Sequence, residues 1–594
     1  HGREIEVPFV KPLFLHDSSG EINPSWVRLE VPICMADNEA EAQYPLQFEE
    51  LRAYSYFHAG EGKHNEFYLG DLTVEMKGVY FRYFEYDRAE ISPDLTSTPL
   101  FFGFDCNFGG NTDYPQRVSA VLELPESVKL EKWLALASWT DITDFCSMET
   151  GPVTRDGKKL IRYAINYHVT KNNMYSYPYP GQKRIRYYLS TKLQQGAVDA
   201  YYYLRFPEYN YTELPKKLPL DVVRIKKGIA PKRIMAQMYV EKGWPGMIAN
   251  VKRLGINRVH IGPAASKEFI EKCEAAGIAI ETNIAGGAIL GNLLSAGAPG
   301  AVNMQGEVSK QMPCLSRPQP GLSGVVDQNK YLIDRGFTFF SFDDEHWGGI
   351  QCFCETCLSA FEDFRKIHGK NLPNLKPKEF CDAYRKSNKG YLHNLQWWAD
   401  NRNDDDTRKL FRLWQDFHHA NYSGAAGLLK KRMQDYAKSK GIKDKIEFYD
   451  EWLQSVCSER SARAAATQGF DYISSNYYGA NPKECGDIVQ TVGKWVKGSG
   501  AKLYWLLGPG LCYWRIQNLK PRRIMKWNVL EAFAAGANGV NMYAYADIDL
   551  LDMKYYSDAI WTVMPVEDIM LEGKDGAGYV QITKGQANLR ALKK

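Results

Sequence analysis

Residues 328–345 read QNKYLIDRGFTFFSFDDE and hold one complete helix–strand unit of the fold. The pattern predicts a helix over Gln328–Arg335 and a buried strand over Phe337–Phe342, separated by Gly336. Glycine is common directly after a helix because it adopts a left-handed backbone without a steric penalty. Three acids, Asp343, Asp344 and Glu345, follow the strand. The stretch therefore predicts a parallel strand that ends in carboxyl groups.

The same unit recurs through the second part of the chain. Glycines also precede four other predicted strands, at Gly255, Gly277, Gly469 and Gly500. Eight alternating strands and helices predict a closed (β/α)8 barrel, the TIM-barrel fold. A doubly wound open sheet is the alternative, but the sequence has no phosphate-binding glycine fingerprint. The expected strands are Arg233–Val240, Asn257–Gly262, Ile278–Ile284, Phe337–Phe342, Lys445–Tyr449, Phe470–Asn476, Lys502–Leu507 and Gly539–Tyr545.

The rest of the chain divides into an N-terminal domain and two insertions. Residues 1–225 lack helical periodicity and contain short aromatic and β-branched runs between turn residues, which predicts an all-β, sandwich-like accessory domain. Residues 226–594 are expected to form the catalytic barrel. We interpret 285–326 as a Gly/Pro-rich loop after strand three and 352–443 as an insertion with long amphipathic helices after strand four.

Composition excludes several classes of protein. The 594 residues are 44% hydrophobic and 24% charged, which excludes a disordered or fibrous chain. The net charge of +4 and the lack of a long basic run argue against nucleic acid as a partner. No apolar stretch approaches the roughly 18 residues of a membrane span. We expect a secreted or periplasmic protein whose signal peptide lies outside the given sequence, with the cytoplasm as the alternative location.

Polar side chains dominate the strand positions expected to face the barrel axis. Burying polar groups costs free energy unless they are partnered, and barrel active sites lie at the C-terminal strand ends. We therefore expect a functional site there, with a self-satisfied hydrogen-bond network as the alternative. Aromatic side chains around the same end suit the stacking of sugar rings. The residues expected to contact a substrate are Asp344, Trp347, Asp450, Trp452, Tyr477, Trp505, Tyr543, Tyr545, Asp547, His260 and Glu241.

The acids at the ends of strands four and five are the candidate catalytic groups. Neighbouring carboxylates repel one another, so at least one of the strand-four acids should have a raised pKa and could serve as a general acid. Two carboxyl groups flanking a bond are the minimum apparatus of glycoside hydrolysis. Asp343, Glu345 and Glu451 share the axial parity and are therefore expected to act in catalysis. Divalent metal binding by the same acids is the alternative.

Cys352, Cys354 and Cys357 form a C-x-C-x-x-C cluster. Thiolates this close can surround one tetrahedral metal ion, and Cys314 in the preceding segment is the candidate fourth ligand. Four thiolates leave no open coordination position, so we predict a structural zinc ion and no cofactor for catalysis. Reduced thiols or a single disulfide are the alternatives.

The strand-four region resembles the family 42 glycoside hydrolases, the β-galactosidases and their relatives. The resemblance lies in Asp344-Glu345 and in the cysteine cluster followed by Leu358, Phe361 and Phe364. It implies a barrel, Glu345 as the acid/base, and zinc bound by Cys314 with the three clustered cysteines.

Two departures limit the resemblance to family 42. The family has Asn-Glu where this chain has Asp344-Glu345, and its strand-seven nucleophile has no counterpart in Leu503–Gly510. β-Galactosidase activity is therefore not transferred. Strands four and five look more like those of retaining α-glycosidase barrels, which implies Asp343 as nucleophile and Glu451 as acid/base.

The function predicted from sequence is hydrolysis of a glycosidic bond in an oligo- or polysaccharide. A non-catalytic glycan-binding protein on a degenerate barrel is the alternative, which the missing strand-seven acid favours. A metal-dependent hydrolase on the same fold is a third hypothesis. The expected partner is a carbohydrate, and the sequence makes no prediction about oligomeric state.

Overall fold

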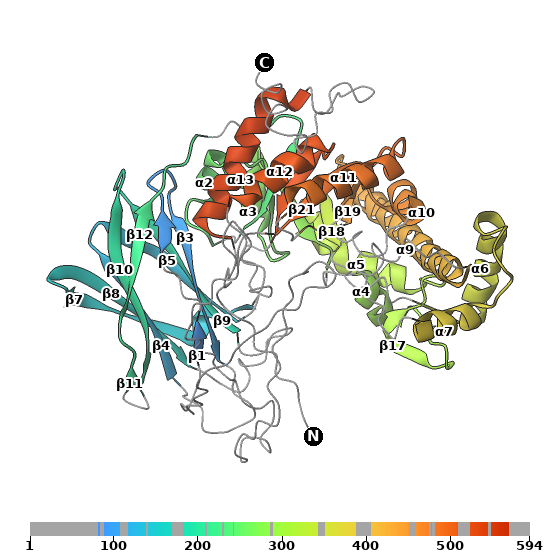
Figure 1. Ribbon diagram of the computed structural model, residues 1–594, viewed down its shortest axis with the longest axis horizontal. Coiled ribbons are helices and arrows are strands. Elements are labelled where there is room, and N and C mark those ends of the chain that lie inside the picture. Colours follow the sequence, from blue (N-terminus) through green and yellow to red (C-terminus); the bar gives the residue numbers. More distant parts are fainter. Residues whose placement is uncertain are drawn as a thin grey trace, which may run out of the picture. The chain divides into compact units, whose positions relative to one another are not determined.

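The computed structural model describes residues 81–83, 88–106, 117–137, 140–168, 182–207, 211–227, 231–240, 243–285, 289–342, 351–387, 406–450, 459–474, 477, 481–508, 523–543 and 548–568 (Figure 1). The chain forms two units. The first extends to Val223 and the second begins at Arg224, except that Ser92–Ser97 belongs to the second unit.

The described residues of the first unit form two β-sheets. The five-stranded sheet has the order β1-β3-β9-β5-β6, and the other has the order β2-β12-β10-β4-β8-β7 with β11 beside β10. Neighbouring strands are antiparallel, except for β2 and β12. The strands are β1 Phe81–Tyr83, β2 Ala89–Ile91, β3 Thr98–Cys106, β4 Arg117–Pro125, β5 Val128–Ala137, β6 Thr140–Asp141, β7 Cys146–Arg155, β8 Lys158–His168, β9 Gln182–Thr191, β10 Ala197–Phe206, β11 Tyr211–Thr212 and β12 Lys216–Val222.

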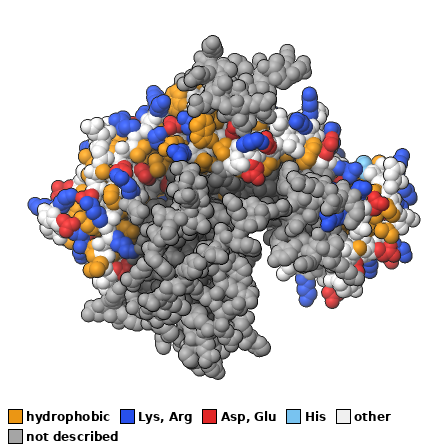
Figure 2. Space-filling view, viewed as in Figure 1, with side chains coloured by type: hydrophobic (Ala, Val, Ile, Leu, Met, Phe, Trp, Pro, Cys, Tyr) orange, Lys and Arg blue, Asp and Glu red, His pale blue; other side chains and the backbone are white. Residues whose placement is uncertain are grey.

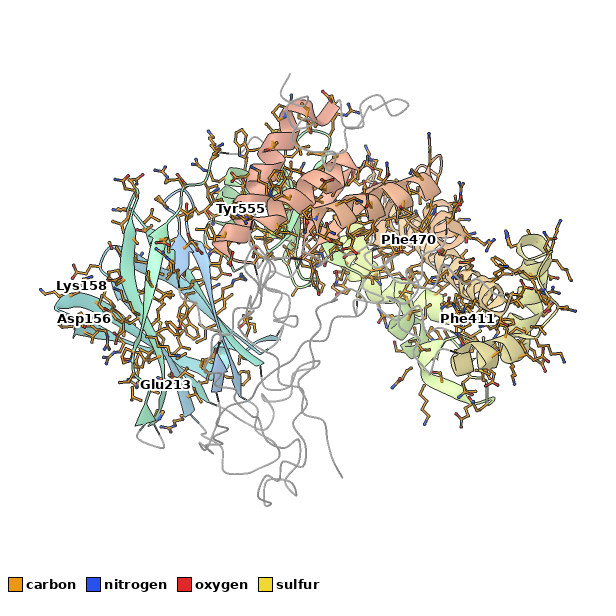
Figure 3. All side chains as sticks on the ribbon, viewed as in Figure 1. Asp156, Lys158, Glu213, Phe411, Phe470 and Tyr555 are labelled. Atoms are coloured by element: carbon orange, nitrogen blue, oxygen red, sulfur yellow. The ribbon has the colours of Figure 1, made fainter. Side chains whose placement is uncertain are left out.

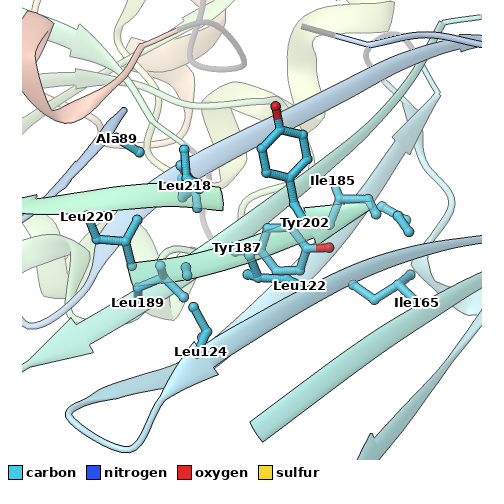
Figure 4. Packing of buried hydrophobic residues seen from close by; sticks show 14 of the residues in the cluster. Ala89, Leu122, Leu124, Ile165, Ile185, Tyr187, Leu189, Tyr202, Leu218 and Leu220 are labelled. Carbon is cyan, nitrogen blue, oxygen red and sulfur yellow. The ribbon is translucent and has the colours of Figure 1, made fainter. Parts of the chain in front are cut away.

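The two sheets share one hydrophobic core (Figure 4). Alternate residues of each strand contribute to it, such as Leu122 and Leu124 from β4 and Ile185 and Leu189 from β9. This alternation is the period-two pattern of strands with one buried face. The all-β, sandwich-like character predicted for residues 1–225 also concerns many residues outside the described ones, and for them it stays a prediction.

The second unit is built on a closed barrel of eight strands in the order β13-β14-β15-β18-β19-β20-β21-β22. Neighbouring strands are parallel, and β22 pairs with β13. The predicted barrel is confirmed, and closure excludes the open doubly wound sheet. Seven strands lie within their predicted ranges, and the fifth ends one residue later, at Asp450. They are β13 Met235–Tyr239, β14 Arg258–His260, β15 Ala279–Asn283, β18 Phe339–Phe342, β19 Glu447–Asp450, β20 Tyr472–Ile473, β21 Lys502–Leu507 and β22 Gly539–Met542.

Helices follow the barrel strands as expected. Gly277 and Gly336 have φ angles of 76° and 106°, as their predicted role after a helix requires. Gly469 instead ends a π-helical turn, where an added Cβ would meet the backbone oxygen of Ser423 at 2.8 Å. The helices around the barrel are α2 Met247–Arg253, α3 Lys267–Ala275, α4 Ile289–Ser295, α5 Gly321–Asp334, α10 Glu459–Ala464, the π-helix η4 Ala465–Gly469, α11 Pro482–Val496, α12 Ile524–Ala534, α13 Leu550–Val563 and the 3₁₀ turn η7 Met564–Val566.

The segment interpreted as a loop, 285–326, is more structured than predicted. It contains α4, the antiparallel hairpin of β16 (Gly300–Val302) and β17 (Val308–Pro313), and the start of α5. The frequent glycines and prolines obscured the apolar spacing of Leu290 and Leu293, which are buried on α4. Some of these glycines permit close packing, since a Cβ on Gly321 would meet the Leu293 backbone oxygen at 2.4 Å.

In the described part of the segment between β18 and β19 there are three helices: α6 (Glu355–His368), α7 (Pro377–Ser387) and α9 (Asp406–Ser439). Their facing aromatic side chains form a buried cluster with the cysteines, which includes Phe361, Phe380, Phe411 and Trp414. Figure 3 labels Phe411 among these helices. α9 has 34 residues and is therefore about 51 Å long at 1.5 Å per residue.

The described surface is mixed in charge. Figure 2 shows acidic and basic side chains interspersed on the visible face, in keeping with the small net charge of +4. Within the described ranges, no helix is both long and apolar enough to cross a bilayer.

Candidate functional site

The predicted catalytic acids Asp343, Glu345 and Glu451 lie outside the described residues. Their roles therefore stay predictions. The same holds for part of the predicted substrate-binding set: Asp344, Trp347, Trp452, Tyr545, Asp547 and Glu241.

Aromatic rings fill the barrel axis where strands β18 to β21 meet. The ring centroids of Tyr449 and Tyr504 are 4.7 Å apart, and those of Phe339 and Tyr504 are 6.2 Å apart. These residues come from strands that are not neighbours in the barrel, so their side chains can meet only across its axis. Burial, reinforced by the negative charge of Glu281, raises the pKa of Tyr504 well above its ordinary value. Its phenol therefore remains a hydrogen-bond donor.

A histidine–carboxylate pair lies beside these rings. His260 Nδ1 is 3.1 Å from Glu281 Oε1, and the imidazole stacks on Tyr239 with centroids 3.9 Å apart. Tyr239 also meets the edge of Tyr543 at 5.2 Å. The contact joins one ring nitrogen of His260 to the carboxyl group, so it sets which edge of the imidazole faces Glu281. The ring of His260 is thus held in position from two sides.

Two amides extend this polar group along the axis. Gln237 Oε1 accepts a hydrogen bond from the Tyr504 hydroxyl, and Asn541 lies opposite Gln237 on the neighbouring strand. Within the part of the chain that the structure describes, Gln237 Nε2, Glu281 Oε2 and both polar side-chain atoms of Asn541 are buried without a hydrogen-bond partner. None of these three residues is among the predicted site residues, although the alternation of side chains along each strand places them on the same face as His260.

Three other predicted substrate contacts are buried in the barrel wall. Trp505 is 0% exposed and pairs with Val540, on the parity opposite to Tyr504. The Tyr477 hydroxyl donates to Asn481 O at 2.5 Å at the start of α11, and burial raises the pKa of this tyrosine. Asp450 is also 0% exposed, at the end of β19. These positions favour packing for Trp505 and Tyr477.

The four predicted zinc ligands come together. The sulfur atoms of Cys314, Cys352, Cys354 and Cys357 all lie within 4.8 Å of one another. Cys314 Sγ is 3.6 Å from Cys357 Sγ and 3.8 Å from Cys354 Sγ. These separations far exceed the ~2.05 Å of a disulfide bond. Four sulfur atoms at 2.3 Å from a tetrahedral zinc ion would be about 3.8 Å apart, so the cluster has the dimensions of such a site.

Neighbouring groups hold the cysteines in place. The backbone N–H of Val302 donates to Cys352 Sγ at 3.3 Å, and the Cys352 N–H donates to His418 Nε2 at 3.4 Å. Ser316 Oγ lies 3.1 Å from Cys357 Sγ and accepts from Asn421 Nδ2 at 3.0 Å. The hairpin, α6 and α9 therefore all contact the cluster.

The electrostatics of the cluster suit metal binding. Hydrogen bonds from Cys352 and Cys357, with further help from Arg317, lower the pKa of Cys314. The hydrogen bond to Cys314 raises the pKa of Cys352 to about 11, and the same cause raises that of Cys357. The pKa of Cys314 is thus lowered at the expense of its neighbours Cys352 and Cys357. A metal ion would displace the remaining protons, as structural zinc does.

No family model matches the chain, and neither does any curated protein. Among solved structures, a Bacteroides ovatus GH5 xyloglucanase in complex with a XXXG heptasaccharide is similar at 9% identity over 81% of this chain and 100% of that one, with a TM-score of 0.28. The C-terminal domain of the Streptococcus agalactiae AgI/II polypeptide BspA is similar at 13% identity over 25% of this chain and 49% of that one, with a TM-score of 0.16. TM-scores this low carry no argument about fold or function.

The observed features define the chain as a TIM-barrel protein. It has a closed parallel eight-stranded barrel with polar side chains on its axis, and it also has a four-cysteine cluster that could bind a metal ion. The family 42 resemblance is not tested by any of these findings.

Proposed function

We propose that the chain is a glycoside hydrolase that acts on an oligo- or polysaccharide through Asp343, Glu345 and Glu451. The observation that carries the proposal is the polar set on the barrel axis, in which Glu281 and Tyr239 fix His260 at the C-terminal end of β14. In TIM-barrel enzymes the substrate binds at this end of the strands. The acids of strands four and five follow β18 and β19 directly in sequence, which supports their placement at the same end.

The test is release of reducing ends from a panel of glycans. Glu345→Gln and Glu451→Gln should each lower the rate by about 10²–10⁴-fold, because each removes a proton-transfer group. Glu447→Gln is the matched control, since Glu447 has the same parity as Glu451 but begins β19, and it should keep full activity. Full activity in both test variants would refute the proposal. Binding without cleavage by the wild type would favour the glycan-binding alternative.

The stereochemistry of the first product would report the carboxyl geometry. Retention requires carboxyl groups about 5–5.5 Å apart, and inversion requires about 6.5–9.5 Å. Retention, followed by NMR of the anomeric proton, is the outcome expected for Asp343 as nucleophile and Glu451 as acid/base.

We further propose that the four cysteines bind one structural zinc ion. The sulfur separations of 3.6 and 3.8 Å support this proposal. The hydrogen bond that the Val302 N–H donates to Cys352 Sγ supports it as well. Elemental analysis should find about one zinc per chain. A wild-type protein without bound metal, or with Cys352 and Cys357 in a disulfide, would contradict it. We also propose that residues 1–225 serve as an accessory domain and that the enzyme is exported.

A further inference from the structure

Buried polar residues gather on four consecutive barrel strands, and those on three of the strands have unpaired atoms. Asn541 on β22, Gln237 on β13 and Glu281 on β15 are each 0% exposed, and His260 on β14 lies between the last two. Within the described ranges, no hydrogen bond reaches Gln237 Nε2, Glu281 Oε2 or either polar atom of the Asn541 amide. The hydrogen bond from Tyr504 to Gln237 shows that this amide points to the axis, because Tyr504 is itself packed there.

A set of buried polar atoms without hydrogen-bond partners lowers the stability of the fold unless a ligand or water molecule pairs with them. A buried polar atom without a partner forfeits the hydrogen bond that it had with water, so native proteins rarely keep several together. Here four such atoms come from residues that share one face of adjacent strands. A ligand or a bound water that completes them would remove the penalty.

The chemistry of the unpaired atoms limits what can bind. Gln237 Nε2 and Asn541 Nδ2 are donors, whereas Glu281 Oε2 and Asn541 Oδ1 are acceptors. The amide donors disfavour a metal cation, and the Glu281 carboxylate disfavours an anion. A neutral hydroxyl group both donates and accepts, so it matches the mixed set. His260 Nε2, the ring nitrogen that does not face Glu281, adds one more polar atom at the C-terminal end of β14.

We propose that Gln237, His260, Glu281 and Asn541 form a site for neutral hydroxyl groups, supplied either by a sugar or by ordered water. The sugar source rests on the proposed glycoside hydrolase function, in which this site forms the floor of the substrate pocket. In that case a sugar ring enters the barrel end on, and Glu281 binds it through Oε2 while Oε1 holds His260.

The first experiment measures thermal stability. If Asn541 has no partner, Asn541→Leu removes a buried unsatisfied amide and should raise Tm. If Asn541 binds hydroxyl groups, the variant should lower Tm by about 2–4 °C for each hydrogen bond lost. Thr282→Val calibrates the comparison, because Thr282 Oγ1 is also buried and unpaired among the described residues but points away from the axis. We expect Thr282→Val to raise Tm.

A Tm of Asn541→Leu at or below that of the wild type supports the site, and a Tm above it overturns the proposal. If Asn541→Leu fails to fold, Glu281→Gln is judged by the same criterion, since it keeps the side-chain volume and removes one acceptor. Both variants are studied in the full-length chain.

The second experiment separates the two sources. The affinity of each protein is measured by calorimetry for the panel glycan that the wild type cleaves fastest. A loss of tenfold or more in Asn541→Leu, with less than twofold change in Thr282→Val, identifies a sugar hydroxyl. A smaller loss of affinity in Asn541→Leu, together with a Tm no higher than that of the wild type, identifies ordered water. If the wild type neither cleaves nor binds any glycan, the proposed function fails, and the Tm comparison still decides whether the hydroxyl site exists.

Discussion

Replacement of Cys357 by alanine should open the helical insertion without opening the barrel. A metal ion held by Cys314 and Cys357 closes a loop of 43 residues. The chain-entropy relation for a cross-link of this size gives about 4 kcal/mol of stabilisation. This corresponds to about a thousandfold change in the equilibrium for local opening.

Hydrogen exchange followed by mass spectrometry would locate the change. Cys357→Ala should lose its zinc and exchange faster in the segments whose side chains surround the cluster: β16, β17, α6, α7 and the first half of α9. Peptides from β13 and β22 should keep their wild-type protection, because these strands close the barrel. A chelator should reproduce the pattern in the wild type.

Cys381→Ala provides the matched control. Cys381 is also 0% exposed in the same hydrophobic cluster, so both variants lose one buried sulfur atom, but Cys381 is not one of the four grouped thiols. It should keep the zinc and its response to the chelator. Equal effects of the two variants, or faster exchange throughout the barrel, would refute the reasoning.

Three further predictions concern packing and pH. Phe361→Ala should lower the free energy of unfolding by about 3–5 kcal/mol, measured by urea titration, because Phe361 is fully buried with its ring 4.8 Å from that of Trp414; a loss below about 1 kcal/mol would contradict it. Gly427→Ala should lower the free energy of unfolding by about 1–3 kcal/mol, because its Cβ would lie 2.0 Å from the Gln468 backbone oxygen. Gly441→Ala is the control: its backbone has a φ angle of 75°, but its Cβ would meet no atom within 4 Å. Burial, followed by the charge of Asp487, raises the pKa of Glu531 to about 7 from 4.5. A raised pKa means that the folded state binds the proton more tightly, so this stabilisation is complete below about pH 4.5 and is lost as the pH rises through 7, by up to about 3 kcal/mol. Glu531→Gln should abolish that component of the pH dependence, and an unchanged profile would show that Glu531 titrates normally.

The barrel was predictable because each unit carries several consistent local signals. Gly277 and Gly336 end helices with positive φ angles, and apolar strands follow each of them. The cysteine cluster was predictable from spacing and residue type, including the distant Cys314. Residue type alone was less reliable for the barrel axis. Trp505 was assigned to the mouth as an aromatic residue, but Tyr504 takes the axial position and leaves the indole in the barrel wall.

The hydrogen-bonded details could not be predicted from the sequence. Parity placed Glu281 and His260 on the same face, but the side-chain contact depends on the register of β14 and β15, which pairs these two residues directly. The register follows from the closure of the whole barrel, and no local pattern encodes it. Similarly, α4 and the β16–β17 hairpin are stabilised by contacts with the surrounding structure, and their glycines suggested a loop.

The short segment Ser92–Ser97 affects how the chain can fold during synthesis. It belongs to the second unit, where the Thr96 N–H donates to Asn250 Oδ1 and Trp244 Nε1 donates to Ser97 O. Thr96 precedes Asn250 by 154 residues. At about 5–20 residues per second, the segment leaves the ribosome about 8–30 s before its partner. The polar groups of this segment must therefore stay hydrated until the chain has been made as far as Asn250.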